Sequence, residues 1–246
     1  MVFEVKVFAR KNFNLERTFI NKKAAAGVDN ISAFEAKVFL KKKLLPRKEY
    51  EGNLLANVED LVEQLKGKRY KAKLVRRQYI PKDNGKLRPL GIPAISDKLL
   101  QTGVKVILEN IYEQDFLPCS YGYRPRTGAT KALEDMHKEL RTGRYYYIVE
   151  ADIKGYFDNI DHDRLMDMLN QRIDDRSFTR LIRKWLKAGI LDTDDKVICP
   201  ASGTPQGGIV SPVLANIYLH YALDTWFEQV VKPQSRGNAC LWRYAF

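Results

Sequence analysis

Apolar residues along the chain recur with two periods, one typical of helices and one typical of strands. Helical spacing occurs once before residue 90 and four times after it. Asp161 and Ser211 stand where helix N-caps are expected. The positions expected to face the core are Val58, Leu61, Val62 and Leu65; Leu100, Val104 and Leu108; Leu165, Met168, Leu169 and Ile173; Leu181, Ile182, Trp185 and Leu186; and Leu214, Ile217, Tyr218 and Tyr221.

Strand patterns are shorter and lie between these helices. Residues 75–81 and 87–93 are rich in β-branched and aromatic residues and flank the turn signal 83–86, which predicts a β-hairpin with a basic tip. Residues 145–149 are almost all apolar, which is typical of a central strand. A second short hairpin is expected over 191–199. The pattern predicts an α+β fold in which helices pack on a small antiparallel sheet.

Charge divides the chain into a basic part and a neutral part. The net charge is +12, and residues 1–90 hold 22 Lys and Arg against 10 Asp and Glu. Residues 91–246 hold 20 of each, so the excess positive charge lies in roughly the first third of the chain. A basic segment beside a neutral one is typical of a polyanion-binding surface joined to a chemical site, although a solvated basic surface would look the same.

The cysteines and the hydropathy exclude several classes of protein. Cys119, Cys199 and Cys240 are far apart and share no metal-ligand spacing with histidines, so we expect neither a disulfide framework nor a zinc site. No apolar run approaches the ~20 residues that span a bilayer. The first residues are too polar for a signal peptide. We therefore expect a cytoplasmic protein with no membrane partner.

Asp152 follows the strand predicted over 145–149 and is the first candidate for chemistry. An ionised carboxylate at such a place needs a cation, a set of hydrogen bonds or a metal. Mg²⁺ prefers hard oxygen ligands, and phosphoryl-transfer sites often use two such ions. Taken alone, the residue would more simply be a cap or an ion-pair partner, and only the neighbouring motifs favour the metal.

Several motifs occur in a fixed order. They are Ile80-Pro81-Lys82-Asp83-Asn84-Gly85-Lys86-Leu87-Arg88-Pro89, Ser120-Tyr121-Gly122-Tyr123-Arg124-Pro125, Ala151-Asp152-Ile153-Lys154-Gly155-Tyr156-Phe157-Asp158, Gly203-Thr204-Pro205-Gln206-Gly207-Gly208 with Ser211-Pro212, and Tyr244-Ala245. In this order they resemble reverse transcriptases, most closely those encoded by group II introns, from about Ala26 to Ala245. The resemblance implies right-hand polymerase fingers (76–145) and an incomplete palm (146–246) after a basic N-terminal extension (1–75).

The resemblance also implies roles for particular residues at the metal. Asp152 matches the first metal-binding aspartate of the family, and Ile153 matches the position whose backbone carbonyl faces the metal. Mg²⁺ is therefore the expected cofactor.

The nucleotide-binding residues implied by the resemblance come from three motifs. Lys82 and Arg88 match the residues of the fingers that hold the triphosphate. Phe157 matches the aromatic ring that excludes a 2′-hydroxyl, and Gln206 matches a residue that contacts the incoming nucleotide. The expected partners are an RNA template, intron RNA, a DNA primer and deoxynucleoside triphosphates.

After Tyr244-Ala245 the family has two aspartates, whereas this sequence has Phe246. We therefore expect the 246-residue polypeptide to bind nucleotide or RNA without synthesising DNA. A missing strand is also expected to leave a sheet edge open to self-association. A non-catalytic maturase module that binds intron RNA is the main alternative, and a nuclease built on Asp152 has little support. The residues do not separate intron-encoded enzymes from retron or CRISPR-associated relatives.

Overall fold

A computed structural model describes residues 3–9, 54–81, 85, 87–143, 145–204 and 206–244. The chain divides into two compact units, of which one holds residues 1–7 and 72–246 and the other residues 8–71. In the second unit the described element is α4 (Leu54–Lys66). This helix confirms the helical period predicted around Leu61, but Val58 and Val62, which were also expected to face the core, are exposed. All further elements below belong to the first unit except the end of β1.

The predicted hairpin is present and belongs to a four-stranded sheet. β2 (Val75–Pro81) pairs antiparallel with β3 (Leu87–Ile92), and Arg77 lies opposite Gly91. β2 also pairs with β5 (Ile190–Leu191), which pairs antiparallel with β6 (Val197–Ile198) and so confirms the second hairpin. The β2–β5 pair is parallel, so the sheet is mixed and the expectation of an antiparallel sheet was wrong in this detail. The reason is that four α-helices, between residues 95 and 186, separate β2 from β5 in sequence, and such a long connection can return the chain in the same direction.

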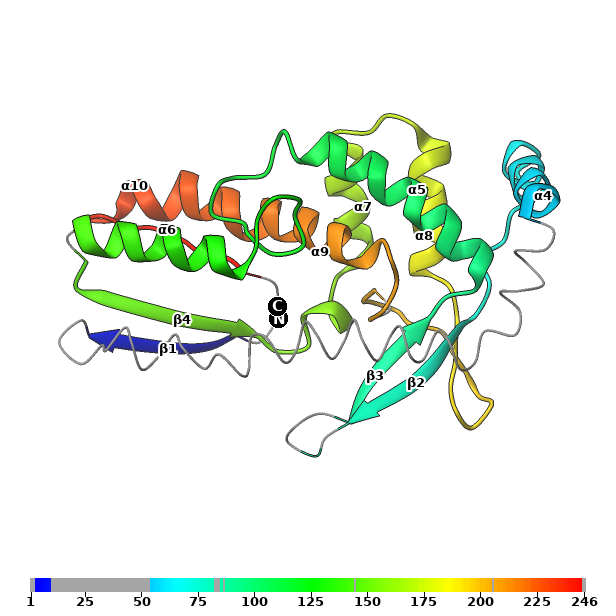
Figure 1. The fold of residues 1–246 in the computed structure, drawn as a ribbon, viewed down its shortest axis with the longest axis horizontal. Helices are drawn as coiled ribbons and strands as arrows, with labels where there is room; N and C mark the ends of the chain where they lie inside the picture. Colours follow the sequence, from blue (N-terminus) through cyan, green and yellow to red (C-terminus); the bar gives the residue numbers. More distant parts are fainter. Residues whose placement is uncertain are drawn as a thin grey trace. The chain divides into compact units, whose positions relative to one another are not determined.

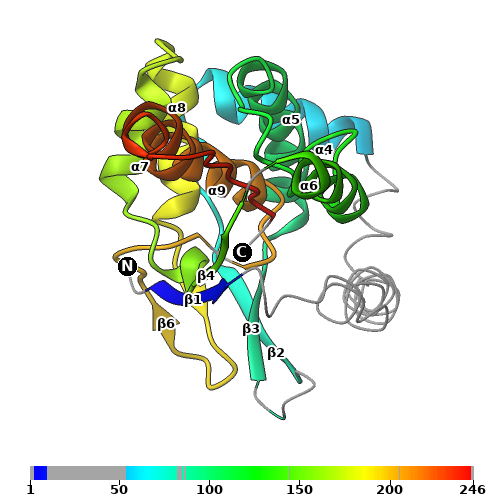
Figure 2. The same ribbon diagram turned by 90° about the vertical axis from the view of Figure 1, so that its left-hand side faces the viewer.

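Four helices form the core of this unit. They are α5 (Ile95–Tyr112), α7 (His162–Asn170), α8 (Arg176–Leu186) and α9 (Ser211–Leu219). α9 packs against α5 and α7, and α7 packs against α8. Figures 1 and 2 show the hairpin β2–β3 projecting away from these helices. Completely buried side chains come from all four helices: Leu108, Leu165, Leu169, Ile182 and Ile217.

The helix α9 is buried on nearly every side, which is typical of a central helix. It begins at Ser211 after an N-cap at Val210 without a side-chain cap, so the prediction of Ser211 as the N-cap was wrong by one residue. Two wide π-helical segments, His220–Asp224 and Phe227–Val231, and then α10 (Lys232–Gln234) continue it. The part of this segment up to Asp224 places polar residues in the core, namely Ser211, Asn216, His220 and Asp224.

The apolar strand predicted around residue 147 is present as β4 (Tyr147–Ile153), but it is not buried. It pairs with β1 (Phe3–Ala9) in a two-stranded sheet, and α6 (Ala129–Thr142) precedes it. Tyr147 is 70% exposed and Val149 is 58% exposed. The prediction of a central strand was therefore wrong, because β4 has a single strand partner among the described residues and an apolar run does not report how many neighbours a strand has.

No helix in the described part of the chain is long and apolar enough to cross a membrane.

Candidate nucleotide site

Backbone hydrogen bonds join two motifs that are more than 40 residues apart in the sequence. After β4, a short 3₁₀ turn covers Tyr156–Asp158. Its Phe157 carbonyl accepts a hydrogen bond from the Thr204 N–H (2.7 Å), and the Gly203 N–H donates to the carbonyl of Ile160 (2.7 Å). A Cβ atom on residue 203 would lie 2.7 Å from the Asp158 carbonyl oxygen. The φ of Gly203, +87°, also favours glycine at this position. The loop around Gly203 is therefore fixed beside Phe157.

The same glycine-rich turn is fixed to the hairpin at its other end. The Gly91 N–H of β3 donates to the Gln206 carbonyl at 2.5 Å. Gly207 has φ +109°, and a Cβ there would lie 2.6 Å from the Gly91 carbonyl oxygen. In the structure, Gly203 and Gly207 allow two parts of the chain itself to approach.

Beside these contacts lies an open pocket of about 230 Å³, lined by the hairpin, the 3₁₀ turn, the glycine-rich loop and residues of β5 and β6. Arg77 and Pro89 line it from the hairpin, Asp158 lines it from the turn, and Thr204 and Gln206 line it from the loop. The pocket brings a cationic side chain, an acid and an amide to one place, which suits a ligand with both charged and hydrogen-bonding groups.

The charge of Arg77 in this pocket is partly balanced. Its Nη1 lies 3.4 Å from Asp192 Oδ2, just after β5. Asp192 also accepts a hydrogen bond from the Thr193 N–H, and this bond and the nearby guanidinium hold the pKa of the Asp192 carboxyl below its usual value. Tyr79 donates to the same carboxylate at 3.3 Å. Asp192 thus joins the hairpin to the strand beside it.

The six predicted site residues divide into those near the pocket and those elsewhere. Gln206 lines the pocket. Phe157 does not line it, but its backbone carbonyl accepts a hydrogen bond from Thr204, which does. Arg88 is exposed on β3, opposite Ile80 and three residues before Gly91, and it is not among the lining residues. Lys82 lies outside the described residues.

Asp152 and Ile153 form the end of β4, immediately before the turn that holds Phe157. Asp152 is exposed, whereas the Ile153 side chain is 4% exposed. Within the described ranges no group of three His, Cys, Asp or Glu side chains could hold a metal ion. Asp152 offers one hard oxygen ligand, which is too few for a protein-made Mg²⁺ site. The described residues therefore do not build a metal site by themselves.

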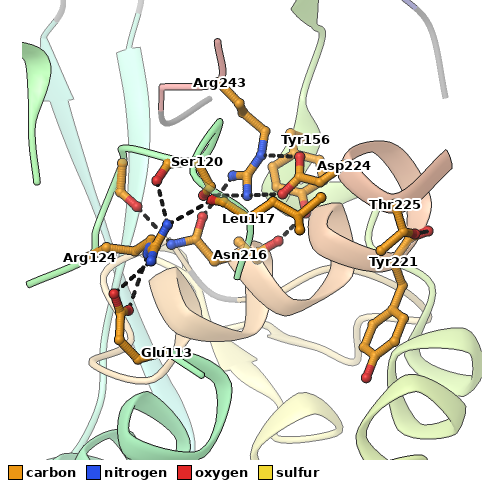
Figure 3. A network of polar contacts seen from close by, with 12 residues as sticks. Glu113, Leu117, Ser120, Arg124, Tyr156, Asn216, Tyr221, Asp224, Thr225 and Arg243 are labelled. Carbon is orange, nitrogen blue, oxygen red and sulfur yellow. Dashed lines mark hydrogen bonds and ion pairs between the residues drawn. The ribbon is translucent and has the colours of Figure 1, made fainter. Parts of the chain in front are cut away.

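Sequence reasoning missed a buried polar network around Arg243, which Figure 3 shows. The Arg243 guanidinium donates to both carboxylate oxygens of Asp224 (2.8 and 2.7 Å), to Asn216 Oδ1 (2.8 Å) and to Ser120 Oγ (2.6 Å). Its backbone pairs with the chain on both sides of Ser120, since its N–H donates to the Cys119 carbonyl and its carbonyl accepts from the Tyr121 N–H. The network fixes the segment before Tyr244 against the loop that carries Ser120.

A second arginine fixes the other side of that loop. Arg124 makes a two-pronged ion pair with Glu113 (2.6 and 3.1 Å), and its Nη1 donates to the carbonyls of Leu117 and Ser120 (3.0 and 2.7 Å). Its guanidinium also lies 5.2 Å from the centre of the Phe116 ring. The sequence showed Arg124 within a family motif but gave no sign of its partners, because Glu113 is 11 residues away.

Comparisons with known proteins identify a matching family and several relatives. Residues 80–245 match the family model described as reverse transcriptase (RNA-dependent DNA polymerase). The chain is 48% identical to the group II intron-encoded protein LtrA of Lactococcus lactis subsp. cremoris over 174 residues. These residues cover 70% of this chain and 28% of LtrA. It is 35% identical to the protein YkfC of Escherichia coli, over 78% of this chain and 51% of YkfC.

The chain thus spans less than a third of LtrA and about half of YkfC. Among solved structures, a chain of a partial Cas6-RT-Cas1–Cas2 complex superposes with a TM-score of 0.48 at 23% identity, over 87% of this chain and 35% of that chain.

Proposed function

The chain belongs to the reverse transcriptase family, and on that premise we propose that it is the fingers and part of the palm of an RNA-directed DNA polymerase of the group II intron type. In this proposal, residues 76–145 are the fingers, residues 146–246 are the palm part and residues 1–75 are an extension that contacts RNA. The pocket between the hairpin and the glycine-rich loop carries the proposal, because it joins Gln206 and the turn of Phe157 to the strand that bears Arg88.

Each residue has a role in this proposal that follows from its chemistry. Arg88, with Lys82, holds triphosphate oxygens, since a guanidinium can bind two of them at once. Gln206 contacts the nucleotide, and the Phe157 ring leaves no room for a 2′-hydroxyl. Asp152 and the Ile153 carbonyl are ligands to a divalent cation, Mg²⁺, which the triphosphate must help to hold. That cation would neutralise charge on the phosphates.

The proposed partners are an RNA template, intron RNA, a DNA primer and deoxynucleoside triphosphates. The cysteines of the described residues are free, which supports the proposal of a reducing, cytoplasmic location. We also propose self-association through a sheet edge, and a strictly monomeric sedimentation profile would contradict that part.

Nucleotide binding tests the proposal directly. Gln206→Ala should weaken dNTP binding by roughly two- to tenfold, as expected for one lost hydrogen bond. The control is Gln171→Ala, because Gln171 is exposed at the end of α7 and does not line the pocket. Equal affinities in both variants, or no dNTP binding by the parent chain, would contradict the proposal.

Primer extension tests the chemistry of the 246-residue polypeptide. Asp152 alone supplies too little negative charge to hold two divalent ions, so we expect dNTP binding without processive synthesis. Processive extension on an RNA template would show that reasoning to be wrong.

A second candidate function is RNA binding without chemistry, and the helix α8 favours it. Arg176, Arg180, Arg183, Lys184 and Lys187 recur at helical spacing, opposite the buried Ile182 and Trp185. Arg183 pairs with Asp163 of α7. The helix itself contains no acid, so its outer face suits the phosphates of an RNA strand.

The salt dependence of RNA binding tests this face. Replacing Arg176, Arg180 and Lys187 with Gln should make the slope of log K against log [salt] shallower by about 2, at ~0.7 per lost phosphate contact to a single strand. The matched control replaces Lys131, Lys138 and Arg141 of α6, where Glu134, Asp135 and Glu139 lie between the cations. Equal slopes in both triple variants would exclude α8 as the binding face.

A further inference from the structure

Tyr123 combines three properties that rarely occur together. It is a bulky residue in the left-handed region, with φ +54°, where aromatic side chains are outliers. It is 51% exposed in a loop whose neighbouring residues Ser120 and Tyr121 are buried. Its ring lies edge-on to the ring of Phe157, with a centroid distance of 6.5 Å and an interplanar angle of 78°. A strained, exposed aromatic residue needs a reason, and outliers of this kind cluster at functional sites.

The loop on both sides of Tyr123 is held by buried side chains. The carbonyl of Gly122 accepts a hydrogen bond from Asn216 Nδ2 (2.7 Å), and Asn216 also accepts from Arg243. On the other side Arg124 is fixed by Glu113, as Figure 3 shows. The Thr127 hydroxyl closes the loop by donating to the Tyr121 carbonyl at 2.8 Å. These contacts hold the backbone of Tyr123 in its strained conformation and so fix where its ring lies.

Phe157 has a second fixed aromatic neighbour. The Tyr156 ring lies 5.6 Å from it at 61°, and Tyr156 is 3% exposed. The Tyr156 hydroxyl donates to the Ala215 carbonyl of α9 at 2.7 Å. Phe157 therefore contacts one ring anchored in the core and one ring anchored by the loop of Arg124.

We propose that Tyr123 is a positioning residue that holds the Phe157 ring for selection of deoxyribonucleotides over ribonucleotides. This inference rests on the proposed function, in which Phe157 lies beside the sugar. A ring excludes a hydroxyl only while it cannot move aside, and the edge-on contact with Tyr123 restricts that movement. The hydroxyl of Tyr123 is not required for this role, but its ring is.

The test compares the binding of dGTP and GTP to the full 246-residue chain. The readout is the ratio of the two dissociation constants, because a loss of overall structure would weaken both together. Tyr123→Ala should lower the discrimination by roughly two- to tenfold, the range expected from an aromatic pair, and Tyr123→Phe should preserve it. The control Tyr146→Ala removes an aromatic residue that is 71% exposed and should also preserve it.

Phe157→Ala separates this inference from the proposed function. If Phe157→Ala abolishes discrimination and Tyr123→Ala does not change it, the role of Tyr123 is refuted while the nucleotide site stands. If Phe157→Ala also leaves the ratio unchanged, or the parent chain binds neither nucleotide, the proposed function fails and the inference fails with it. In the Phe157→Ala background, Tyr123→Ala should have no further effect on the ratio.

A measurement without nucleotide examines the ring contact itself. With 4-fluorophenylalanine at position 157, Tyr123→Ala should shift or broaden the ¹⁹F resonance, whereas Tyr146→Ala should leave it in place. An unchanged resonance in Tyr123→Ala would overturn the positioning role regardless of nucleotide binding.

Discussion

The buried ion pair between Arg243 and Asp224 allows a prediction of large magnitude. The side chains are 1% and 0% exposed, and the guanidinium makes four hydrogen bonds to Asp224, Asn216 and Ser120. Asp224→Ala would leave this cation buried without its counter-charge. Breaking a buried pair from one side costs about 3–5 kcal/mol in the free energy of unfolding. Replacing both members with apolar residues, as in Asp224→Leu with Arg243→Met, should cost much less because no buried charge is left.

Urea unfolding measures this difference. With a slope of about 3 kcal/mol/M, a loss of that size lowers the midpoint by about 1–1.7 M. The control is Glu228→Ala, which breaks the exposed pair with Lys232 and should cost at most about 0.5 kcal/mol. A midpoint shift in Asp224→Ala as small as that of Glu228→Ala would refute the reasoning, and so would a double variant less stable than Asp224→Ala.

Three further predictions concern stability. Gly207→Ala should lower the free energy of unfolding by at least about 1–2 kcal/mol, because the φ of Gly207 is +109° and Gly91 leaves no room for a Cβ. Gly103→Ala within α5 should instead raise it by about 0.5–1 kcal/mol. Thermal unfolding of both variants checks this. Asp175→Ala should cost about 1 kcal/mol in urea unfolding, because its carboxylate caps the N-terminus of α8. Burial lowers the pKa of His220 below 6.5, so as the pH falls the unfolded chain binds a proton before the folded chain does. The free energy of unfolding should therefore be highest above about pH 6.5 and decrease below it. His220→Phe should flatten this dependence between pH 7 and 5.

Local signals predicted the parts of the fold that depend on neighbouring residues. The hairpin β2–β3 followed from its turn signal, and the Asp161 cap of α7 is present because its carboxylate accepts from the Arg164 N–H. The exposure of β4 could not be predicted, because the apolar run does not say which surfaces cover it. The parallel pairing of β2 with β5 depends on the path of the four α-helices between them.

The polar network could not be predicted from spacing in the same way. Ser120 and Arg243 are 123 residues apart, and polar residues in a sequence are most often exposed. One signal was available, since Asp224 falls at helical spacing after Ile217 and so lies on the buried side of its helix. Of the site, the sequence placed Gln206 and Phe157 in their motifs, but the backbone hydrogen bonds that join the motifs have no sequence pattern.

The contacts around Gly91 limit how the hairpin can respond to a ligand. Its base is bonded to the Gln206 carbonyl, and the loop before Gln206 is bonded to Phe157 through Thr204. A hinge motion at the base would break these bonds and separate the walls of the pocket. Movement that preserves the pocket must therefore occur beyond Pro89, toward the tip, where Arg88 is exposed. A ligand that enters this pocket would thus meet fixed walls at Thr204 and Gln206, whereas Arg88 lies in the part of the hairpin that these bonds do not constrain.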